Sequence, residues 1–388
     1  MKRVGNWFFC DGHLFNLATK QLVPVGQLPE SEVNSRFVAS QEFLKITELI
    51  PLPVPPVSKV HQIVALEITD KCNYACRYCY EGKSYENSAF MSFQDACRVA
   101  DSLSAGGEIR FFGGEPLLNF GLIRQVVERY PALQYSLVTN GSLVTEEIAQ
   151  YLASHKFNVG VSYDGRCSQS KNRLALLGDS SVDFRRAVEL LKSSGVTVGV
   201  STVITKEHIQ HLYDIHLEVF SQWEVGGWAY LLAYSPDMTM KDLDAFKEQV
   251  FAIVRDFPAE HLMRINDLRK WCMKVAGEWP LQAYCGSGIC YKAIAVDGTE
   301  RLCPFFLRES ACYSPEMRTV EVDCAKCGIW NYCHGGCLAL NRFSSGDTHL
   351  SHPFACKKNY IYFEAGLRTR IKKLREESTC ILNNNAMH

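Results

Sequence analysis

Between residues 61 and about 275, the pattern of apolar and polar positions alternates between strand-like and helix-like segments. Short apolar segments predict six β-strands, at 61–69, 108–112, 134–139, 157–163, 196–204 and 226–233. The longer segments between and after them have helical spacing and predict helices at 92–103, 120–129, 145–155, 182–193, 207–220 and 241–255. Because strands that alternate with helices form βα units, the pattern predicts an α/β fold built on a parallel sheet.

The helix expected at 92–103 shows this pattern most clearly. Ser92 is a suitable N-cap for it. One face of the helix carries an apolar stripe that consists of Phe93, Ala96, Cys97, Ala100 and Leu103. Cys97 is therefore expected to be a core residue and not a metal ligand.

The segments that flank the βα region have a different character. Residues 1 to about 50 predict a small β-containing unit, with strands near 7–10 and 13–17 and a helix near 41–49. A proline-rich stretch then predicts a stiff, extended linker. We expect three domains, which are the N-terminal unit with its linker (1–56), the βα domain (57–278) and a cysteine-rich domain with a C-terminal helix (279–388).

Composition narrows the classes of protein to consider. The 388 residues are 47% hydrophobic and carry a formal net charge of −1, with no sustained basic stripe for nucleic acid. No run of eighteen apolar residues occurs, and the first residues lack the apolar region of a signal peptide. We expect a cytoplasmic protein with neither nucleic acid nor membrane as a partner. Seventeen cysteines in such a chain favour metal binding over disulfides.

Three of the cysteines form a CxxxCxxC loop directly after the first predicted strand, at Cys72, Cys76 and Cys79. Iron–sulfur clusters are normally held by four thiolates, so three would leave one iron without a protein ligand. A structural zinc site, a disulfide with one spare thiol, or three buried thiols would also account for this loop taken alone.

The loop, with Tyr78 just before its last cysteine, resembles the signature of radical S-adenosylmethionine (SAM) enzymes. The resemblance implies that Cys72, Cys76 and Cys79 hold a 4Fe-4S cluster whose open iron is chelated by the amino and carboxylate groups of SAM, with Tyr78 among the cofactor-binding residues. It also implies that the six βα units form a partial (β/α)6 TIM barrel. In such barrels the reactive site lies at the C-terminal ends of the strands.

Further motifs at predicted strand ends extend this resemblance. Gly113, Gly114 and Glu115 resemble the family's GGE motif, which receives the SAM ammonium group. Asn140 and Ser162 match segments that line SAM and are candidates for its ribose. Arg173 resembles an arginine that holds the SAM carboxylate, although Gln169 and Ser170 stand where His-Asp is usual. Each motif also has an ordinary interpretation, as a turn or as a surface arginine.

The C-terminal region contains a CxxCx5Cx3C motif with further cysteines on both sides, and together they resemble the SPASM domain of radical SAM enzymes that act on peptides and proteins. The resemblance implies two auxiliary 4Fe-4S clusters. The first would be held by Cys285, Cys290, Cys303 and Cys337. The second would be held by Cys324, Cys327, Cys333 and Cys356. A double structural zinc site is the alternative. The other thiols, apart from Cys97, are expected to be buried or incidental, namely Cys10, Cys167, Cys272, Cys312 and Cys380.

The activity implied by the resemblance is reductive cleavage of SAM to methionine and a 5'-deoxyadenosyl radical, which abstracts a substrate hydrogen. A low-potential donor such as flavodoxin or ferredoxin would supply the electron. We expect a maturase that forms thioether or carbon–carbon cross-links in a ribosomally made precursor peptide, whose leader the N-terminal unit could contact. Asp237, Glu278 and Asp297 are candidate bases that the sequence does not separate.

Two other functions compete with this one. Anaerobic sulfatase-maturating enzymes of the family carry an acidic residue soon after the third SPASM cysteine. Here Cys303 is followed by Pro-Phe-Phe-Leu, which favours the peptide maturase. A non-catalytic iron–sulfur electron carrier would explain the cysteines but not the Gly113–Glu115 motif or the βα pattern.

Overall fold

The computed structural model describes residues 2–26, 29–49, 62–79, 89–233, 238–281, 283–307, 324, 326–345, 351 and 353–385. The chain forms two compact units. Unit 1 comprises Met1–Ser58, Thr239–Cys285 and Thr319–His388, and unit 2 comprises Lys59–Met238 and Gly286–Arg318. The segment 239–278, which the sequence analysis places with the βα domain, is thus grouped with the two ends of the chain.

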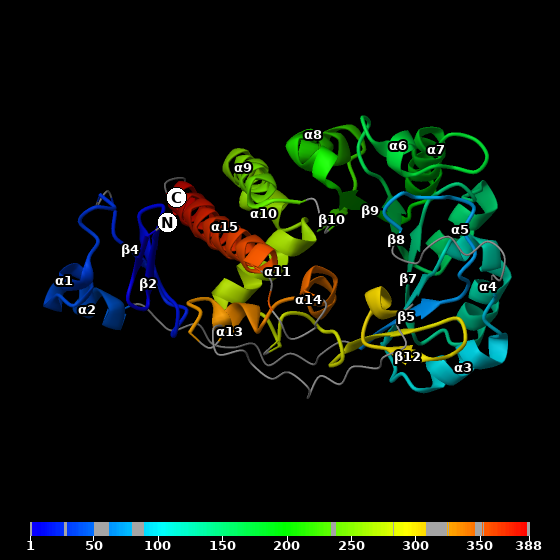
Figure 1. Cartoon of the computed structure of the whole chain (residues 1–388), viewed down its shortest axis with the longest axis horizontal. Coiled ribbons are helices and arrows are strands. Elements are labelled where there is room, and N and C mark those ends of the chain that lie inside the picture. Colours follow the sequence, from blue (N-terminus) through cyan, green and yellow to red (C-terminus); the bar gives the residue numbers. More distant parts are fainter. Residues whose placement is uncertain are drawn as a thin grey trace. The chain divides into compact units, whose positions relative to one another are not determined.

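Unit 2 is built on an eight-stranded sheet in the order β10-β9-β8-β7-β6-β5-β11-β12 (Figure 1). The six predicted strands are confirmed as β5 (Ile63–Glu67), β6 (Glu108–Phe112), β7 (Gln134–Thr139), β8 (Asn158–Ser162), β9 (Thr197–Ile204) and β10 (Gly227–Leu232). Each pairs in parallel with its sequence neighbour. Mostly apolar strands suit a parallel sheet that is covered on both faces. The predicted fold class, an α/β fold with a partial TIM barrel, is confirmed.

A hairpin that the sequence analysis missed extends this sheet beyond β5. Its strands are β11 (Tyr291–Ile294) and β12 (Glu300–Arg301). β11 pairs in parallel with β5, and β12 pairs antiparallel with β11. The hairpin shares an apolar cluster with β5 and β6, formed by Ala65, Phe112, Ala293, Ala295 and Leu307.

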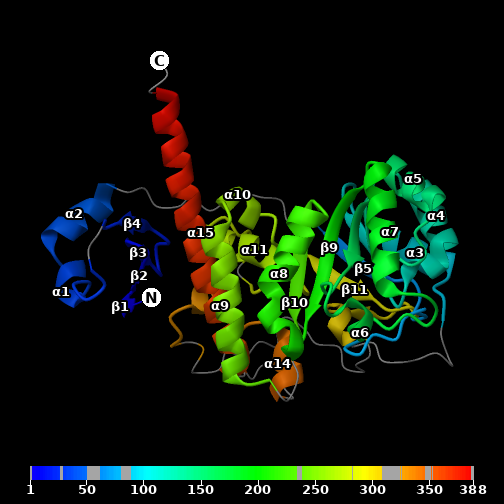
Figure 2. The ribbon, with the colours of Figure 1, turned by 90° about the horizontal axis from the view of Figure 1, so that it is seen from above.

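The helices of unit 2 follow the strands as predicted. They include α3 (Phe93–Asp101), α4 (Phe120–Arg129), α5 (Glu146–Ser154), α6 (Gln169–Asn172), α7 (Ser180–Ser193) and α8 (Leu212–Leu217). Figure 2 shows α3, α4, α5 and α7 along one side of the sheet. Short 3-10 segments lie at η1 (Pro116–Asn119) and η2 (Lys206–His211), and a π segment lies at η3 (Glu218–Gln222). The single helix predicted at 207–220 is therefore divided into η2, α8 and part of η3.

Helix α3 agrees with the sequence prediction at its N-cap but only in part along its apolar stripe. The Ser92 hydroxyl accepts a hydrogen bond from the Asp95 amide at 3.1 Å, so the predicted N-cap is confirmed. Ala96 and Ala100 are buried, but Phe93 is 38% exposed and Cys97 is only half-buried. The apolar stripe is therefore narrower than predicted, because only its central line of small residues reaches the core.

Unit 1 begins with a four-stranded antiparallel sheet whose strands follow one another in chain order. The strands are β1 (Lys2–Val4), β2 (Trp7–Cys10), β3 (His13–Asn16) and β4 (Leu22–Pro24), followed by α1 (Ser35–Val38) and α2 (Gln41–Leu49). A small core of Phe9, Leu14, Val23, Val33 and Phe43 lies between the sheet and the helices. The predicted strands and the helix at 41–49 are confirmed.

The rest of the described part of unit 1 is largely helical. The helices described there are α9 (Met240–Asp256), α10 (Ala259–Leu262), α11 (Asn266–Ala276), α13 (Trp330–Cys333), α14 (Leu338–Ser345) and α15 (Pro353–Asn385). α15 packs along α11, and a Cβ at Gly366 would overlap the backbone of Trp271, so the two helices need glycine there. The N-terminal sheet also packs on α15, since Phe8 and Phe15 contact Phe363. No described helix is both long and apolar enough to cross a membrane.

Candidate functional site

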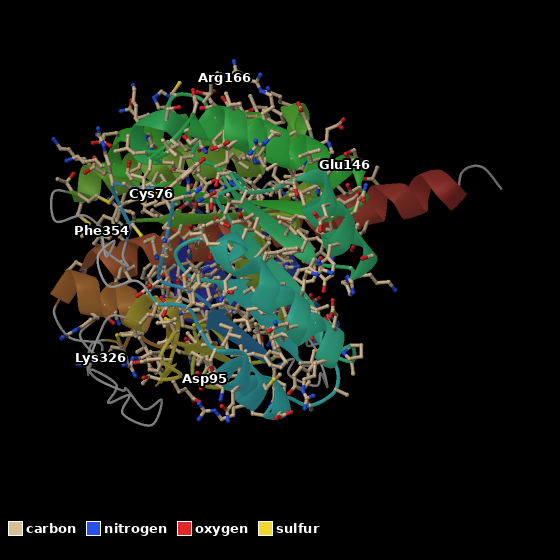
Figure 3. All side chains as sticks on the ribbon, turned by 90° about the vertical axis from the view of Figure 1, so that its right-hand side faces the viewer. Cys76, Asp95, Glu146, Arg166, Lys326 and Phe354 are labelled. Atoms are coloured by element: carbon tan, nitrogen blue, oxygen red, sulfur yellow. The ribbon has the colours of Figure 1, made fainter. Side chains whose placement is uncertain are left out.

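The three-cysteine loop leaves the C-terminal end of β5 and is held by a neighbouring backbone segment. The Ala75 amide donates to the Leu174 carbonyl at 2.7 Å, and the Arg77 amide donates to the Asn172 carbonyl at 2.9 Å. These bonds bracket Cys76, which Figure 3 labels. The loop is therefore a fixed part of the sheet edge, next to the segment that follows α6.

The cysteines of this loop differ in exposure. Cys72 and Cys76 are half-buried and Cys79 is exposed. Burial raises the pKa of the Cys72 thiol to about 12 and also raises that of Cys76, which the Arg173 charge lowers in turn. In the described part of the chain, no three His, Cys, Asp or Glu side chains converge tightly enough to hold a single metal ion.

A buried network joins this loop to the ends of β8 and β9. The Asp164 carboxylate is fully buried and accepts hydrogen bonds from Tyr78 Oη, from Arg173 Nη2 at 3.3 Å and from the Val203 amide at 3.0 Å. The Arg173 guanidinium also lies over the Tyr78 ring, 5.5 Å from its centroid. Arg173 is only 7% exposed, so its interpretation as a surface residue is wrong.

The Arg173 side chain retains an unused donor. Its Nε lies 3.1 Å from Asp164 Oδ2 but is not aligned for a hydrogen bond, so it is a buried donor without an acceptor. Burial lowers the pKa of Arg173 and the Asp164 charge raises it, with a net increase, so the guanidinium stays charged. A charged guanidinium with a free donor fits the carboxylate that the sequence resemblance assigns to this position.

The two glycines of the Gly113–Glu115 motif have a clear structural reason. Gly113 has φ +140°, and a Cβ on it would overlap the Thr69 carbonyl oxygen, while a Cβ on Gly114 would overlap that of Lys71. The Gly114 amide donates to the Thr69 carbonyl at 2.9 Å. Glycine thus lets the backbone after β6 run directly beside the segment that enters the cysteine loop.

The Glu115 carboxylate faces inward. It is fully buried and accepts hydrogen bonds from Thr139 Oγ1 at 2.7 Å, the Asn140 amide at 2.8 Å and the Leu117 amide at 3.1 Å. Burial raises the pKa of Glu115 to about 7, although these hydrogen bonds oppose the increase. Glu115 therefore connects the ends of β6 and β7, a role that the sequence resemblance did not include.

Asn140 and Ser162 lie at neighbouring strand ends, as predicted. Asn140 Nδ2 donates to Asn73 Oδ1 at 2.9 Å, which ties the end of β7 to the cysteine loop. Ser162 is the last residue of β8 and is buried. The structure thus brings the cysteine loop, the glycine motif, Asn140, Ser162 and Arg173 to one edge of the sheet. Sequence reasoning missed Asn73 and Asp164, although Asp164 lies only two residues after the predicted Ser162.

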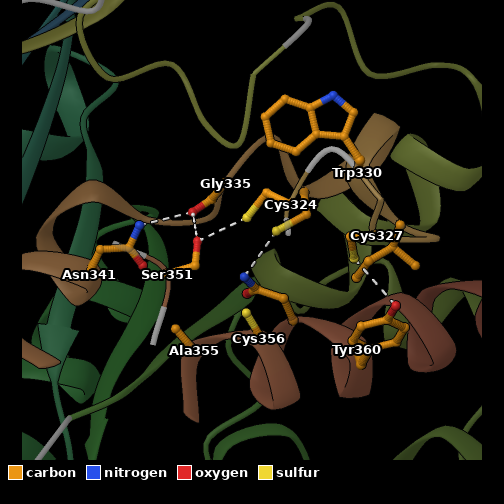
Figure 4. Close-up of a pocket in the computed structure, with 12 residues that line it drawn as sticks. Cys324, Cys327, Trp330, Gly335, Asn341, Ser351, Ala355, Cys356 and Tyr360 are labelled. Atoms are coloured by element: carbon orange, nitrogen blue, oxygen red, sulfur yellow. Dashed lines mark hydrogen bonds between the residues drawn. The ribbon is translucent and has the colours of Figure 1, made fainter. Parts of the chain in front are cut away.

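A second site lies in unit 1, where four cysteines line one pocket (Figure 4). They are Cys324, Cys327, Cys333 and Cys356, the set predicted for the second auxiliary cluster. The rest of the lining consists of Ile329, Trp330, Gly335, Asn341, Ser351, Ala355, Asn359 and Tyr360. The pocket draws these cysteines from three separate stretches: the start of the motif, the short helix α13 and the first turns of α15.

Polar groups surround the sulfur atoms of this pocket. Asn359 Nδ2 donates to Cys333 Sγ at 3.2 Å. Ser351 Oγ lies 3.3 Å from Cys324 Sγ, and Tyr360 Oη lies 3.4 Å from Cys327 Sγ. Burial raises the pKa of Cys333 to about 12, and the Asn359 hydrogen bond lowers it. The Asn359 donor stabilises a thiolate ligand, so the four cysteines around this pocket fit a cluster that is larger than a single metal ion.

The cysteines expected to hold the first auxiliary cluster are divided between the units. Cys285 and Cys337 belong to unit 1, whereas Cys290 and Cys303 belong to unit 2. Within unit 2, Cys290 precedes β11 and Cys303 follows β12, and Ser287 Oγ donates to the Leu302 carbonyl at 2.8 Å. The hairpin therefore holds Cys290 and Cys303 at its same end. The assignment of all four cysteines to the first auxiliary cluster stays a prediction.

The remaining candidates have simpler environments. Cys10 and Cys272 are buried as expected, whereas Cys167 is exposed. Asp297 accepts a hydrogen bond from the Thr299 amide at 2.9 Å in the turn between β11 and β12. Glu278 is exposed. Asp237, Cys312 and the side chain of Cys380 lie outside the described residues.

Residues 66–218 match the model of the Radical SAM superfamily. The matched residues run from β5 to the first residue of η3. The uncharacterized protein MJ0907 of Methanocaldococcus jannaschii is 34% identical over 38% of this chain and 55% of its own length. The chain thus spans about half the length of this relative. A cysteine-type anaerobic sulfatase-maturating enzyme of Clostridium perfringens is 22% identical over 80% of this chain and 96% of its own length.

Two solved structures share the fold. The structure of anSMEcpe with bound AdoMet has a TM-score of 0.68 at 22% identity and covers 80% of this chain and 94% of that chain. Streptococcus suis SuiB bound to precursor peptide SuiA has a TM-score of 0.57 at 14% identity and covers 85% of this chain and 83% of that chain. At these identities the likeness establishes the fold.

Proposed function

We propose that this protein is a radical SAM peptide maturase that forms oxidative cross-links, thioether or carbon–carbon, in a ribosomally made precursor peptide. The observation that carries the proposal is the presence of two sulfur sites in one chain. A three-cysteine loop lies beside the buried Arg173, and a four-cysteine pocket lies in unit 1. The fold shared with SuiB, which was solved with a precursor peptide, supports a peptide substrate.

In this proposal Cys72, Cys76 and Cys79 would hold a 4Fe-4S cluster, and SAM at that cluster would supply a 5'-deoxyadenosyl radical. Arg173 would bind the SAM carboxylate through its Nε donor, while Asp164 fixes the orientation of the guanidinium. Tyr78 covers the guanidinium face and excludes water from the pair.

The auxiliary sites give the proposal its oxidative character. A cross-link removes two hydrogen atoms from the peptide, of which one is abstracted as an atom and the other leaves as a proton and an electron. Eight further cysteines would hold two more 4Fe-4S clusters, whose chemistry is electron transfer. A low-potential donor such as flavodoxin or ferredoxin would supply the electron for SAM cleavage.

The N-terminal sheet is the proposed contact for the leader of the precursor. Within this sheet β1 is an edge strand, to which an extended peptide can add by main-chain hydrogen bonds. The test is to compare processing of the precursor with and without its leader, and to add the free leader as a competitor. Equal processing in all three reactions would contradict this role.

Sulfatase maturation is the second candidate function. It is favoured by the match to the Clostridium perfringens sulfatase-maturating enzyme over 96% of that enzyme's length. The segment after Cys303, with no acidic residue before position 308, argues against it. A synthetic peptide carrying a sulfatase motif distinguishes the two, because only a sulfatase maturase converts its cysteine or serine to an aldehyde that a hydrazide probe detects.

The proposal is tested with anaerobically reconstituted protein, dithionite and SAM. Formation of 5'-deoxyadenosine is expected, and replacement of Cys72, Cys76 and Cys79 by Ala should abolish it while about eight irons stay bound. Co-expression with a short peptide encoded beside the enzyme should lower the peptide mass by two hydrogen atoms per link. If protein that carries its iron–sulfur clusters formed no 5'-deoxyadenosine, the proposal that it is a radical SAM enzyme would be refuted.

A further inference from the structure

A buried lysine on α11 connects two cysteine-bearing segments of unit 1. Lys274 is only 3% exposed, and its Nζ donates to the carbonyls of Ala283 at 2.8 Å and Tyr332 at 2.6 Å. Ala283 lies two residues before Cys285, and Tyr332 directly precedes Cys333. One ammonium group therefore ties together the backbones that carry Cys285 and Cys333.

The surroundings of this ammonium group are largely aromatic. Lys274 Nζ lies 5.5 Å from the ring centroid of Trp271, 5.7 Å from that of Trp279 and 5.6 Å from that of Tyr284. Aromatic faces attract a cation and exclude water. A charge in such a low-dielectric setting acts on neighbouring charges more strongly than one at the surface.

Lys274 also lies close to the four-cysteine pocket. Its Nζ donates to the carbonyl of Tyr332, the residue directly before Cys333, which lines that pocket. Lys270, one turn earlier on α11, lies 2.8 Å from the Asp267 carboxylate, which balances its charge locally. Lys274 is thus placed to stabilise negative charge at the sulfur atoms near the end of α13.

We infer that Lys274 is a positioning residue for the auxiliary iron–sulfur site of the four-cysteine pocket, which fixes the Cys285 and Cys333 segments relative to one another and raises the reduction potential of a cluster bound in that pocket. The inference rests on the proposed function. A cluster gains one negative charge on reduction, and a nearby buried cation stabilises the more negative state. The cysteine motifs gave no sign of this lysine.

The test isolates the auxiliary clusters by replacing Cys72, Cys76 and Cys79 with Ala in every protein. Lys274→Met and Lys274→Gln remove the charge, Lys274→Arg retains it, and Lys373→Met removes a 43% exposed charge from α15 of the same unit. Midpoint potentials are measured by anaerobic redox titration monitored by electron paramagnetic resonance, together with bound iron.

Both neutral variants should show a reduced-to-oxidised ratio about tenfold lower at a given potential, which is a shift of about 59 mV to lower potential for one electron. Lys274→Arg and Lys373→Met should retain the parent potential. Lys274→Met should also bind less iron than Lys274→Gln, whose amide can still donate to one carbonyl.

Unchanged potentials in the neutral variants would overturn the inference, and so would an equal shift in Lys274→Arg. If Lys274→Met does not fold, Lys274→Gln decides the question. The two failures are distinguishable: a parent protein that binds auxiliary iron but whose neutral variants keep its potentials refutes only the inference, whereas a parent protein that binds no auxiliary iron refutes the proposed auxiliary clusters as well.

Discussion

Arg173 and Asp164 form a buried ion pair beside the cysteine loop, with Arg173 Nε 3.1 Å from Asp164 Oδ2 and side chains that are 8% and 0% exposed. A buried charge that loses its partner is left uncompensated in a low-dielectric environment. The pair therefore contributes to the site in two ways: it keeps Arg173 charged, and it fixes the direction in which the guanidinium points.

The first prediction concerns this ion pair. Asp164→Asn should lower the free energy of unfolding by about 3 kcal/mol, because it leaves the Arg173 charge buried without a counter-ion. It should also weaken SAM binding measured by calorimetry, since the guanidinium loses its orientation. Asp214→Asn is the control, because Asp214 is 68% exposed and pairs only loosely with His211. Equal stability of the two variants would contradict the role of Asp164.

The second prediction follows from the pKa of Glu115, which burial raises from 4.5 to about 7. The folded protein binds the Glu115 proton more tightly than the unfolded chain, so this contribution to stability is fully present below pH 4.5 and is lost as the pH rises through 7. The loss amounts to about 3 kcal/mol, because one pKa unit corresponds to about 1.4 kcal/mol.

The predicted loss of stability is checked by measuring the unfolding free energy of wild-type protein and of Glu115→Gln between pH 4 and pH 8. The variant has no titrating group at this position. The difference in unfolding free energy between the two proteins should shift by about 3 kcal/mol across the range, to the disadvantage of the wild type at high pH. A difference that does not depend on pH would show that Glu115 titrates normally.

The third prediction concerns the close approach at Gly113. Gly113→Ala should destabilise the fold by about 3 kcal/mol, because its Cβ would overlap the Thr69 carbonyl oxygen and its φ of +140° strains an L-residue. Gly121→Ala in α4 is the matched control, since a Cβ there meets no atom within 4 Å, and alanine should stabilise the helix by up to about 1 kcal/mol. Urea unfolding of the two variants distinguishes them, and similar midpoints would refute the packing argument.

The fourth prediction concerns the four-cysteine pocket. Replacing Cys324 and Cys327 together by Ala should reduce bound iron from about twelve atoms to about eight per chain, because one of three 4Fe-4S clusters loses two ligands. Cys167→Ala, at an exposed thiol of unit 2, should leave the iron content unchanged. Iron analysis after anaerobic reconstitution provides the measurement. Retention of all iron by the double variant would mean that the pocket holds no cluster.

The features that the sequence predicted correctly are those that depend on local pattern. The six parallel strands and the Ser92 cap follow from periodicity and hydrogen-bonding chemistry over a few residues. The grouping of Cys324, Cys327, Cys333 and Cys356 follows from a motif whose spacing resembles that of a known domain.

The features that the sequence missed depend on contacts between distant residues. Asp164 looks like a turn residue until Arg173 and Tyr78 are seen to converge on it. Lys274 resembles any charge on an amphipathic helix until its carbonyl partners are known. The helix expected at 207–220 is divided because its apolar spacing does not distinguish α from 3-10 or π hydrogen bonding.

The pairing of β11 with β5 has a consequence for folding. The Ile63 amide at the start of β5 donates to the Cys290 carbonyl at 2.8 Å, so this side of β5 obtains its partner only from residues beyond 285. A chain that ends at residue 278 would present β5 as an unpaired apolar edge, which is a template for aggregation. During synthesis β5 keeps this unpaired edge until the hairpin has left the ribosome, so the sheet of unit 2 is completed only after β11 and β12 have been made.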